Sequence, residues 1–309
     1  MNFRELRARL IASYGRFVFF PDDPETSKVI STKAFSHLVI DEDIIVYATK
    51  AMEEQLEEEL KEKYEVVYGT PDLKGEYFVS PNAKIGNINF SFRSGYEILK
   101  KAMRKPFPEE LEIIKEFSTA MENALNSALS EMRIGMLLIE IKNILDCHLL
   151  KNGANSFSYP TIVAAGRDSR HVMPSTRNMK ITEDKIIYLD ASPAKDGYPL
   201  NFSRIIFTSE RREWIESLEK INAMYLEFSN KIRAGIKCDF ADAVVRRVGD
   251  FPHYSMVPSG GFYQPFAPSD CILEEGMLAT VVPSIYTKEW VIRVKRNVVI
   301  RKSGVEFLI

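Results

Sequence analysis

The sequence predicts a mixed α/β protein, of the α/β or α+β class, with two domains. Short apolar strand patterns alternate with amphipathic helical patterns over residues 1–103, which is typical of a small α/β domain. Residues 160–207 contain three β-type runs separated by glycine and proline turns, which indicates a hairpin-rich sheet. Pro106 follows a helical pattern and stops it. We therefore expect domains at residues 1–103 and 104–309.

The first domain begins with a helical pattern at residues 3–14, where apolar side chains recur at helical spacing. Two more helices are expected, at residues 51–65 and within 91–105. Strands are expected at residues 17–21, 43–48, 66–68, 77–79 and 85–90. Because strands and helices alternate, we expect a parallel sheet covered by helices.

The second domain begins with a long amphipathic helix from Pro108, whose acidic first turn suits the helix dipole. A second helix over residues 136–150 ends at an Asn-Gly pair, a favourable C-cap. Two further helices are expected after the central β-rich block, at residues 210–232 and 239–248. Strands are expected at residues 161–163, 186–189, 202–207, 277–282, 290–295 and 298–301.

Composition places the chain among ordinary globular proteins. Of its 309 residues, 45% are hydrophobic and 27% charged, and the net charge of −2 gives no reason to expect a nucleic-acid partner. The first residues carry charge throughout and lack the apolar segment of a signal peptide, and no apolar run has the length needed to cross a bilayer. We therefore expect a cytoplasmic protein without a membrane partner.

Three cysteines, Cys147, Cys238 and Cys271, are far apart and have no metal-site spacing. Each is expected to pack in the core as a free thiol in a reducing compartment.

The last strand region is locally basic. Charge on an edge strand protects it from pairing with other chains, so we expect a solvated edge strand here. Its basic residues are Arg293, Lys295, Arg296, Arg301 and Lys302.

Several short segments occur in a characteristic order. They are Ala-Ala-Gly-Arg-Asp-Ser-Arg-His at 164–171, Leu-Asp-Ala at 189–191, Asp-Gly-Tyr at 196–198, Ser-Arg at 203–204, Arg-Ala-Gly at 233–235, Leu-x-Glu-Gly-Met at 273–277 and Pro-Ser-Ile-Tyr at 283–286. This ordered set resembles the pita-bread metallopeptidases (peptidase family M24), which include prolidase, aminopeptidase P and creatinase, over about residues 104–302. The resemblance implies a small creatinase-like N-terminal α/β domain, a pita-bread C-terminal domain and a homodimer.

The resemblance also implies a two-metal site with two aspartates, one histidine and two glutamates. The first aspartate corresponds to Asp190, but the other four positions hold Asn201, Val257, Val282 and Lys295. Hydrocarbon side chains cannot coordinate a metal, and a protonated ammonium repels a divalent ion. We therefore expect no metal cofactor.

A buried aspartate without a metal needs another compensating partner. Because the aligned ligand faces inward, we expect Lys295 to contact Asp190 in place of the metal, with Asn201 assisting. The alternative is that Lys295 points into solvent with its basic neighbours.

The resemblance also implies two histidines that bind the substrate. His171 matches the first, whereas the second falls at Gln264. A lone histidine in a polar turn can equally be structural, and His171 is the one candidate for catalysis. The vestigial cleft is therefore expected at the following residues: His171, Asp190, Asn201, Val257, Gln264, Val282 and Lys295.

These replacements indicate a non-catalytic relative of prolidase and aminopeptidase P, with a metal-free cleft that binds a peptide or a protein partner. The alternative is a hydrolase of the Xaa-Pro dipeptidase type that is metal-independent or uses a non-standard site. The fold alone cannot decide between them, because function depends on the site.

Overall fold

The computed structural model describes residues 2–84, 90–262 and 271–309. The chain forms two compact units: the first extends to Glu110 and takes in Gly261, and the second begins at Leu111 and includes the C-terminal strands. The boundary expected from the sequence lies at residue 103, and the assignment of two separate domains stays a prediction. No helix among the described residues has the length and apolar character needed to span a bilayer.

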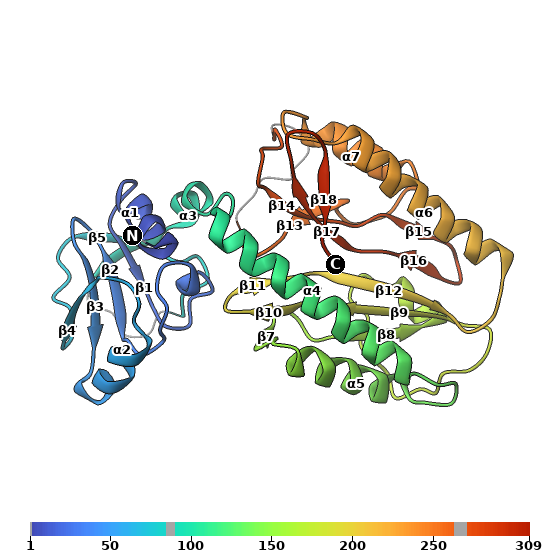
Figure 1. Cartoon of the computed structure of the whole chain (residues 1–309), viewed down its shortest axis with the longest axis horizontal. Helices are drawn as coiled ribbons and strands as arrows, with labels where there is room; N and C mark the ends of the chain where they lie inside the picture. The colour runs from blue at the N-terminus through green and yellow to red at the C-terminus, as the bar shows by residue number, and fades with distance from the viewer. Residues whose placement is uncertain (1, 85–89, 263–270) are drawn as a thin grey trace. The chain divides into compact units, whose positions relative to one another are not determined.

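A six-stranded sheet forms the first unit, in the order β4-β3-β2-β1-β5-β6 (Figure 1). Its strands are β1 (Phe17–Phe19), β2 (His37–Ile40), β3 (Ile44–Ala48), β4 (Glu65–Tyr68), β5 (Glu76–Val79) and β6 (Ser91–Ser94). The prediction of a parallel sheet is wrong, because β2 pairs antiparallel with both β1 and β3, and only the β1–β5, β3–β4 and β5–β6 pairs are parallel. The short turn between β2 and β3 permits this hairpin.

The helices of the first unit are α1 (Phe3–Ala12), α2 (Glu53–Glu59) and α3 (Tyr96–Ala102), with short 3₁₀ turns at Thr26–Lys28 and Lys50–Met52. The Asn2 side chain caps α1 by accepting from the backbone N–H of Glu5 at 3.0 Å. Helix α2 is shorter than predicted. Of the predicted strand at 85–90, residues 85–89 lie outside the described residues.

Long helices flank the sheets of the second unit (Figure 1). The helices are α4 (Pro108–Glu131), α5 (Leu138–Lys151), α6 (Arg212–Lys231) and α7 (Cys238–Arg246), with a 3₁₀ turn at Gly166–Arg170. Apolar side chains of α4 recur at helical spacing and are buried, among them Ile114, Phe117, Met121 and Leu125. The four helices predicted from periodicity are therefore confirmed, with ends shifted by a few residues.

The central β-rich block forms a three-stranded antiparallel sheet in the order β12-β9-β8 and a smaller one in the order β11-β10-β7. Its strands are β7 (Ser156–Phe157), β8 (Ile162–Ala165), β9 (Ile186–Ala191), β10 (Pro193–Lys195), β11 (Tyr198–Pro199) and β12 (Phe202–Phe207). The register places Asp190 of β9 between Ile162 of β8 and Ser203 of β12. Asp190 therefore lies in a central strand, as expected from its place at the end of an apolar run.

The C-terminal strands form a four-stranded sheet in the order β13-β14-β17-β18 and a β15–β16 hairpin. They are β13 (Met256–Pro258), β14 (Leu278–Val281), β15 (Ser284–Tyr286), β16 (Val291–Arg293), β17 (Arg296–Ile300) and β18 (Val305–Phe307). A large apolar core lies between these strands and helices α6 and α7. The prediction of a solvated edge strand is wrong here, because β17 has neighbours on both sides and Arg293 is 2% exposed.

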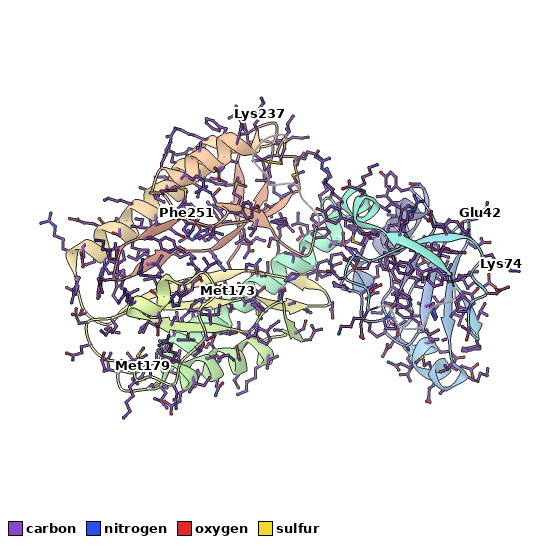
Figure 2. All side chains as sticks on the ribbon, turned by 180° about the vertical axis from the view of Figure 1, so that it is seen from behind. Glu42, Lys74, Met173, Met179, Lys237 and Phe251 are labelled. Carbon is purple, nitrogen blue, oxygen red and sulfur yellow. A yellow bond between two sulfur atoms is a disulfide. The ribbon has the colours of Figure 1, made fainter. Side chains whose placement is uncertain are left out.

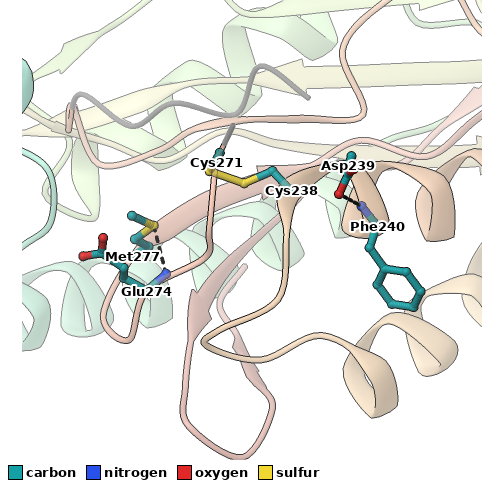
Figure 3. The surroundings of a disulfide bond; sticks show 6 residues. All are labelled: Cys238, Asp239, Phe240, Cys271, Glu274 and Met277. Carbon is teal, nitrogen blue, oxygen red and sulfur yellow. Dashed lines mark hydrogen bonds between the residues drawn. A yellow bond between two sulfur atoms is a disulfide. The ribbon is translucent and has the colours of Figure 1, made fainter. Parts of the chain in front are cut away.

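The cysteine prediction is also wrong. Cys238, at the start of α7, forms a disulfide with Cys271 (Figure 3). Cys147 is exposed rather than packed in the core. The backbone N–H of Cys238 donates to the carbonyl of Cys271 at 2.8 Å, next to a bridge between Lys237 and Ile272. Backbone pairing between two segments 33 residues apart thus brings the two thiols together. The spacing of the cysteines along the sequence could not reveal this contact.

Candidate functional site

Asp190 is the centre of the candidate site. Its side chain is fully buried, and both of its carboxylate oxygens accept hydrogen bonds. The hydroxyl of Tyr159 donates to Oδ1 at 2.8 Å, and the hydroxyl of Tyr188 donates to Oδ2 at 2.6 Å. Hydrogen bonds to a charged acceptor are stronger than neutral ones, so these two tyrosines hold the carboxylate in place.

Lys295 supplies the cation beside this carboxylate. Its Nζ donates to Asp190 Oδ2 at 2.7 Å and to the Tyr159 hydroxyl at 3.3 Å, and its side chain is 14% exposed. The backbone N–H of Lys295 donates to Ser203 Oγ at 2.8 Å, which anchors the lysine opposite β12. The predicted Asp190–Lys295 contact is confirmed, and the alternative of a solvent-directed lysine is wrong.

Asn201 belongs to a neighbouring amide network rather than to the ion pair. Its Oδ1 accepts from Ser192 Oγ at 2.7 Å, and its Nδ2 donates to Thr280 Oγ1 at 3.3 Å. Asn297 binds the Asn201 backbone in both directions, accepting from its N–H at 3.2 Å and donating to its carbonyl at 2.9 Å. Asn201 therefore contributes to the site through hydroxyl and amide partners and places no second charge beside Asp190.

The two hydrocarbon positions lie on or beside β14. Val282 is 5% exposed and directly follows this strand, whereas Val257 of β13 is half-buried and pairs with Thr280. Neither side chain offers a donor atom to a cation.

Arg293 is a second cation at the site, buried close to the ion pair. Its guanidinium donates to the carbonyl of Val172 at 3.0 Å, to that of His171 at 3.3 Å and to the hydroxyls of Tyr188, at 3.4 Å, and Tyr286. Burial opposes its charge, but the two tyrosine hydroxyls outweigh burial and raise the pKa of Arg293 above its ordinary value. Burial, followed by the charge of Asp190, raises the pKa of Tyr188, which keeps the hydroxyl protonated as a donor.

His171 lies beside this network at the surface. Arg293 holds its backbone carbonyl, and its imidazole is exposed. The segment that follows is also open to solvent: Met173 is 57% and Met179 39% exposed (Figure 2). Gln264, the other predicted substrate-binding position, lies outside the described residues.

His253 lies four residues before Val257, one of the positions at which the resemblance implies a metal ligand. Its Nε2 is 3.0 Å from Ser284 Oγ and its Nδ1 2.9 Å from the carbonyl of Tyr254, so it is held by structural partners. Burial, assisted by the charges of Arg293 and Lys295, lowers its pKa to about 4, while the hydrogen bond with Tyr254 opposes this shift. The imidazole of His253 is therefore uncharged at neutral pH.

This set of donor atoms does not fit a pair of divalent cations. Bridging carboxylates are required at such sites, yet the oxygens of the Asp190 carboxylate are occupied by two hydroxyls and an ammonium. Among the described residues, no group of three or more histidine, cysteine, aspartate or glutamate side chains is arranged to hold a metal ion.

Sequence reasoning missed several members of the site. Tyr188 and Arg293 each lie two residues before a predicted site residue, and residues two apart on a strand share a face, so this signal could have found them. Asn297 lies two residues after Lys295, and Tyr286 ends the Pro-Ser-Ile-Tyr segment at 283–286 that the sequence had singled out. Tyr159 precedes a proline in a loop and carried no such signal.

Comparison with known proteins assigns the family. The model of metallopeptidase family M24 matches residues 112–302. The chain is 22% identical over 267 residues to a Xaa-Pro dipeptidase of Pyrococcus furiosus, covering 80% of this chain and 76% of that protein. It is 26% identical over 210 residues to the uncharacterized peptidase YqhT of Bacillus subtilis, covering 63% of this chain and 59% of that protein, less than two thirds of its length.

The fold agrees with this assignment. Prolidase from Pyrococcus furiosus superposes with a TM-score of 0.83 at 19% identity, covering 94% of this chain and 95% of that one. A Xaa-Pro dipeptidase from Bacillus anthracis gives 0.84 at 20% identity, covering 98% and 97%. The chain thus has the pita-bread fold predicted from its sequence, and it belongs to metallopeptidase family M24.

Proposed function

We propose that this chain is a non-catalytic member of its family, whose cleft lacks the metal centre and binds a peptide or protein partner. The observation that carries the proposal is the 2.7 Å contact between Lys295 and the buried carboxylate of Asp190. The ammonium supplies the positive charge that a metal would supply, and it repels any divalent ion that approaches. Without the metal, the site has no activated water for peptide hydrolysis.

Binding is supported by the groups that stay accessible at the site. The imidazole of His171 is exposed beside the buried Arg293 network, and Lys295 is partly exposed. These groups can meet polar atoms of a guest while the tyrosines keep Asp190 in place. The Xaa-Pro dipeptidases among the relatives suggest proline-containing peptides as the first ligands to examine.

The decisive experiment is a metal analysis of the full chain after incubation with Mn²⁺, Co²⁺ or Zn²⁺ and desalting, together with an Xaa-Pro dipeptide hydrolysis assay. We expect far less than one metal ion per chain and no turnover. Stoichiometric metal that disappears in Asp190→Asn, or turnover abolished by a chelator, would overturn the proposal. Turnover that survives chelation and disappears in His171→Ala would establish the competing function of a metal-independent hydrolase.

Peptide binding is measured separately by calorimetric titration of Xaa-Pro peptides. We expect saturable binding to the wild-type chain that weakens in His171→Ala, with the same substitution at His148, on α5, as the control. No heat of binding with any peptide would leave a protein partner as the ligand class and remove the peptide half of the proposal.

A cytoplasmic location and a homodimer complete the proposal. The dimer is tested by light scattering on a gel-filtration column, where a mass near 35.4 kDa would show a monomer and remove it.

A further inference from the structure

A pocket of about 540 Å³ lies in the second unit between helix α4, β12, β17 and β18. The residues used below are Lys115, Glu122, Arg204, Arg296, Glu306 and Phe307. Its volume is within the range of small-molecule sites, roughly 300–1,000 Å³. We call it the α4–β18 pocket.

This pocket is distinct from the Asp190 site. Arg204 directly follows Ser203 on β12, and Ser203 pairs with Asp190 in the antiparallel register. Paired residues share a face and successive residues alternate between faces. Arg204 therefore projects from the face of the sheet opposite to Asp190.

Two guanidinium groups line the pocket without a carboxylate partner. Within the described parts of the chain, neither Arg204 nor Arg296 forms an ion pair; Arg204 donates to the carbonyl of Ser203 at 3.2 Å, and Arg296 lies over the Tyr225 ring at 4.8 Å and the Phe307 ring at 6.0 Å. The two aromatic rings fix the Arg296 guanidinium in place.

The arginines influence each other electrostatically. Burial, and then the charge of Arg296, lowers the pKa of Arg204 from its ordinary value, and Glu122 opposes this effect. Two like charges directed into one pocket repel each other. An anion between them would remove this repulsion, since arginine binds phosphate and carboxylate oxygens through its planar fork of donors.

The acidic side chains of the pocket compensate the two arginines only in part. The Glu306 carboxylate already forms ion pairs with Lys115, at 3.2 Å, and with Arg301, at 2.9 Å. Glu122 lies on the exposed side of α4, and among the described side chains that line the pocket it is the acidic group left to face both arginines.

We infer that the α4–β18 pocket binds a small dianion whose phosphate or paired carboxylate oxygens bridge Arg204 and Arg296. The inference is independent of the proposed function, because it concerns the opposite face of the sheet and none of the Asp190 site residues.

The test is calorimetric titration of the full chain with inorganic phosphate, and separately with succinate, at constant ionic strength. Acetate and chloride serve as singly charged controls. We expect one saturable site for at least one of the two dianions. Tighter binding of phosphate would identify phosphate as the source of the oxygens, and tighter binding of succinate would identify a dicarboxylate. Equal, unsaturable responses to all four anions would overturn the inference.

Three variants sharpen the test. Arg296→Gln and Arg204→Gln are each expected to lower the affinity about tenfold or more, because each removes hydrogen bonds between charged groups. Glu122→Gln is expected to raise it by about threefold, since it removes the competing carboxylate. Arg212→Gln, with a side chain 92% exposed at the start of α6, makes the same charge change outside the pocket and is expected to have no effect.

Glu122→Gln keeps the test decisive even if an arginine variant fails to fold, because Glu122 is exposed on its helix. Unchanged or weakened dianion affinity in Glu122→Gln would contradict the inference. So would wild-type affinity in a folded Arg296→Gln protein.

Discussion

The ammonium of Lys295 lies 2.7 Å from a carboxylate oxygen of Asp190, whose side chain is fully buried. Tyr159 and Tyr188 complete the shell around this carboxylate. A buried ion pair gains its stability from close geometry and additional hydrogen bonds, because both charges lose their hydration. The pair thus makes the stability of the fold depend on two residues that the family resemblance assigns to metal-ligand positions.

Replacing Lys295 with methionine should destabilise the protein strongly. The substitution leaves Asp190 buried without a countercharge, which costs about 3–5 kcal/mol. Urea denaturation measures the change in the free energy of unfolding.

The double variant Asp190→Asn, Lys295→Met removes both charges and should be more stable than Lys295→Met alone. Lys302→Met is the matched control, since the Lys302 side chain is 83% exposed, and it should change the free energy of unfolding by less than about 0.5 kcal/mol. Equal effects at Lys302 and Lys295 would refute the role of the ion pair.

Introducing the ligands that the family resemblance implies should create a metal site. The variant that combines Asn201→Asp, Val257→His, Val282→Glu and Lys295→Glu introduces oxygen and nitrogen donors at the four positions that the resemblance assigns to metal ligands. At a Mn²⁺ concentration 100 times the dissociation constant, binding should add about 2.7 kcal/mol to the free energy of unfolding. The triple variant that keeps Lys295 is the control and should bind no metal, because its ammonium repels the ion. Metal binding by the triple variant would contradict this role of Lys295.

His253 should make stability depend on pH. Its pKa is about 4 in the folded protein and 6.5 ordinarily, so between these values the unfolded chain binds more protons. The free energy of unfolding therefore rises as the pH increases from 4 to 6.5. Above that range the contribution of His253, roughly 2–3 kcal/mol, is fully present. Denaturation curves across this range, compared with His253→Gln, isolate the effect.

Asp23 provides a control of opposite sign for this pH dependence. Burial raises its pKa from 3.8 to about 6, so the folded protein binds more protons between these values and this contribution is lost as the pH rises through 6. Asp23→Asn should therefore steepen the increase of stability with pH, whereas His253→Gln should flatten it. The same slope in wild type and His253→Gln would show that His253 is not buried as a neutral imidazole.

The disulfide should be detectable by thiol titration. Unfolded in denaturant without a reductant, the protein should show one reactive thiol, that of Cys147, and after reduction it should show three. Cys238→Ala should cost about 2–4 kcal/mol, because the bridge closes a long loop in the unfolded chain. Cys147→Ser is the control and should leave stability unchanged. Three reactive thiols in protein purified without reductant would support the sequence-based expectation of a reducing compartment.

The periodicity of the sequence predicted most elements of the fold. The apolar spacing of α4 and α6 and the apolar runs of β9 and β12 depend on local burial patterns, which a sequence displays directly. The parallel sheet of the first unit was predicted wrongly, because strand direction depends on how β2 and β3 pair. The strand β6 has four exposed residues and therefore no apolar pattern to reveal it.

The ordered motifs of the sequence by themselves determined the pita-bread fold, and the family resemblance that they carry predicted the inward position of Lys295. The tertiary structure alone decided which groups surround Asp190, since Tyr159 reaches it from a loop 31 residues away and Lys295 from the segment between β16 and β17, 105 residues away. It also decided the pairing of Cys238 with Cys271 and the joint position of Arg204 and Arg296 in one pocket. These contacts depend on packing between distant segments, which no local pattern in the sequence encodes.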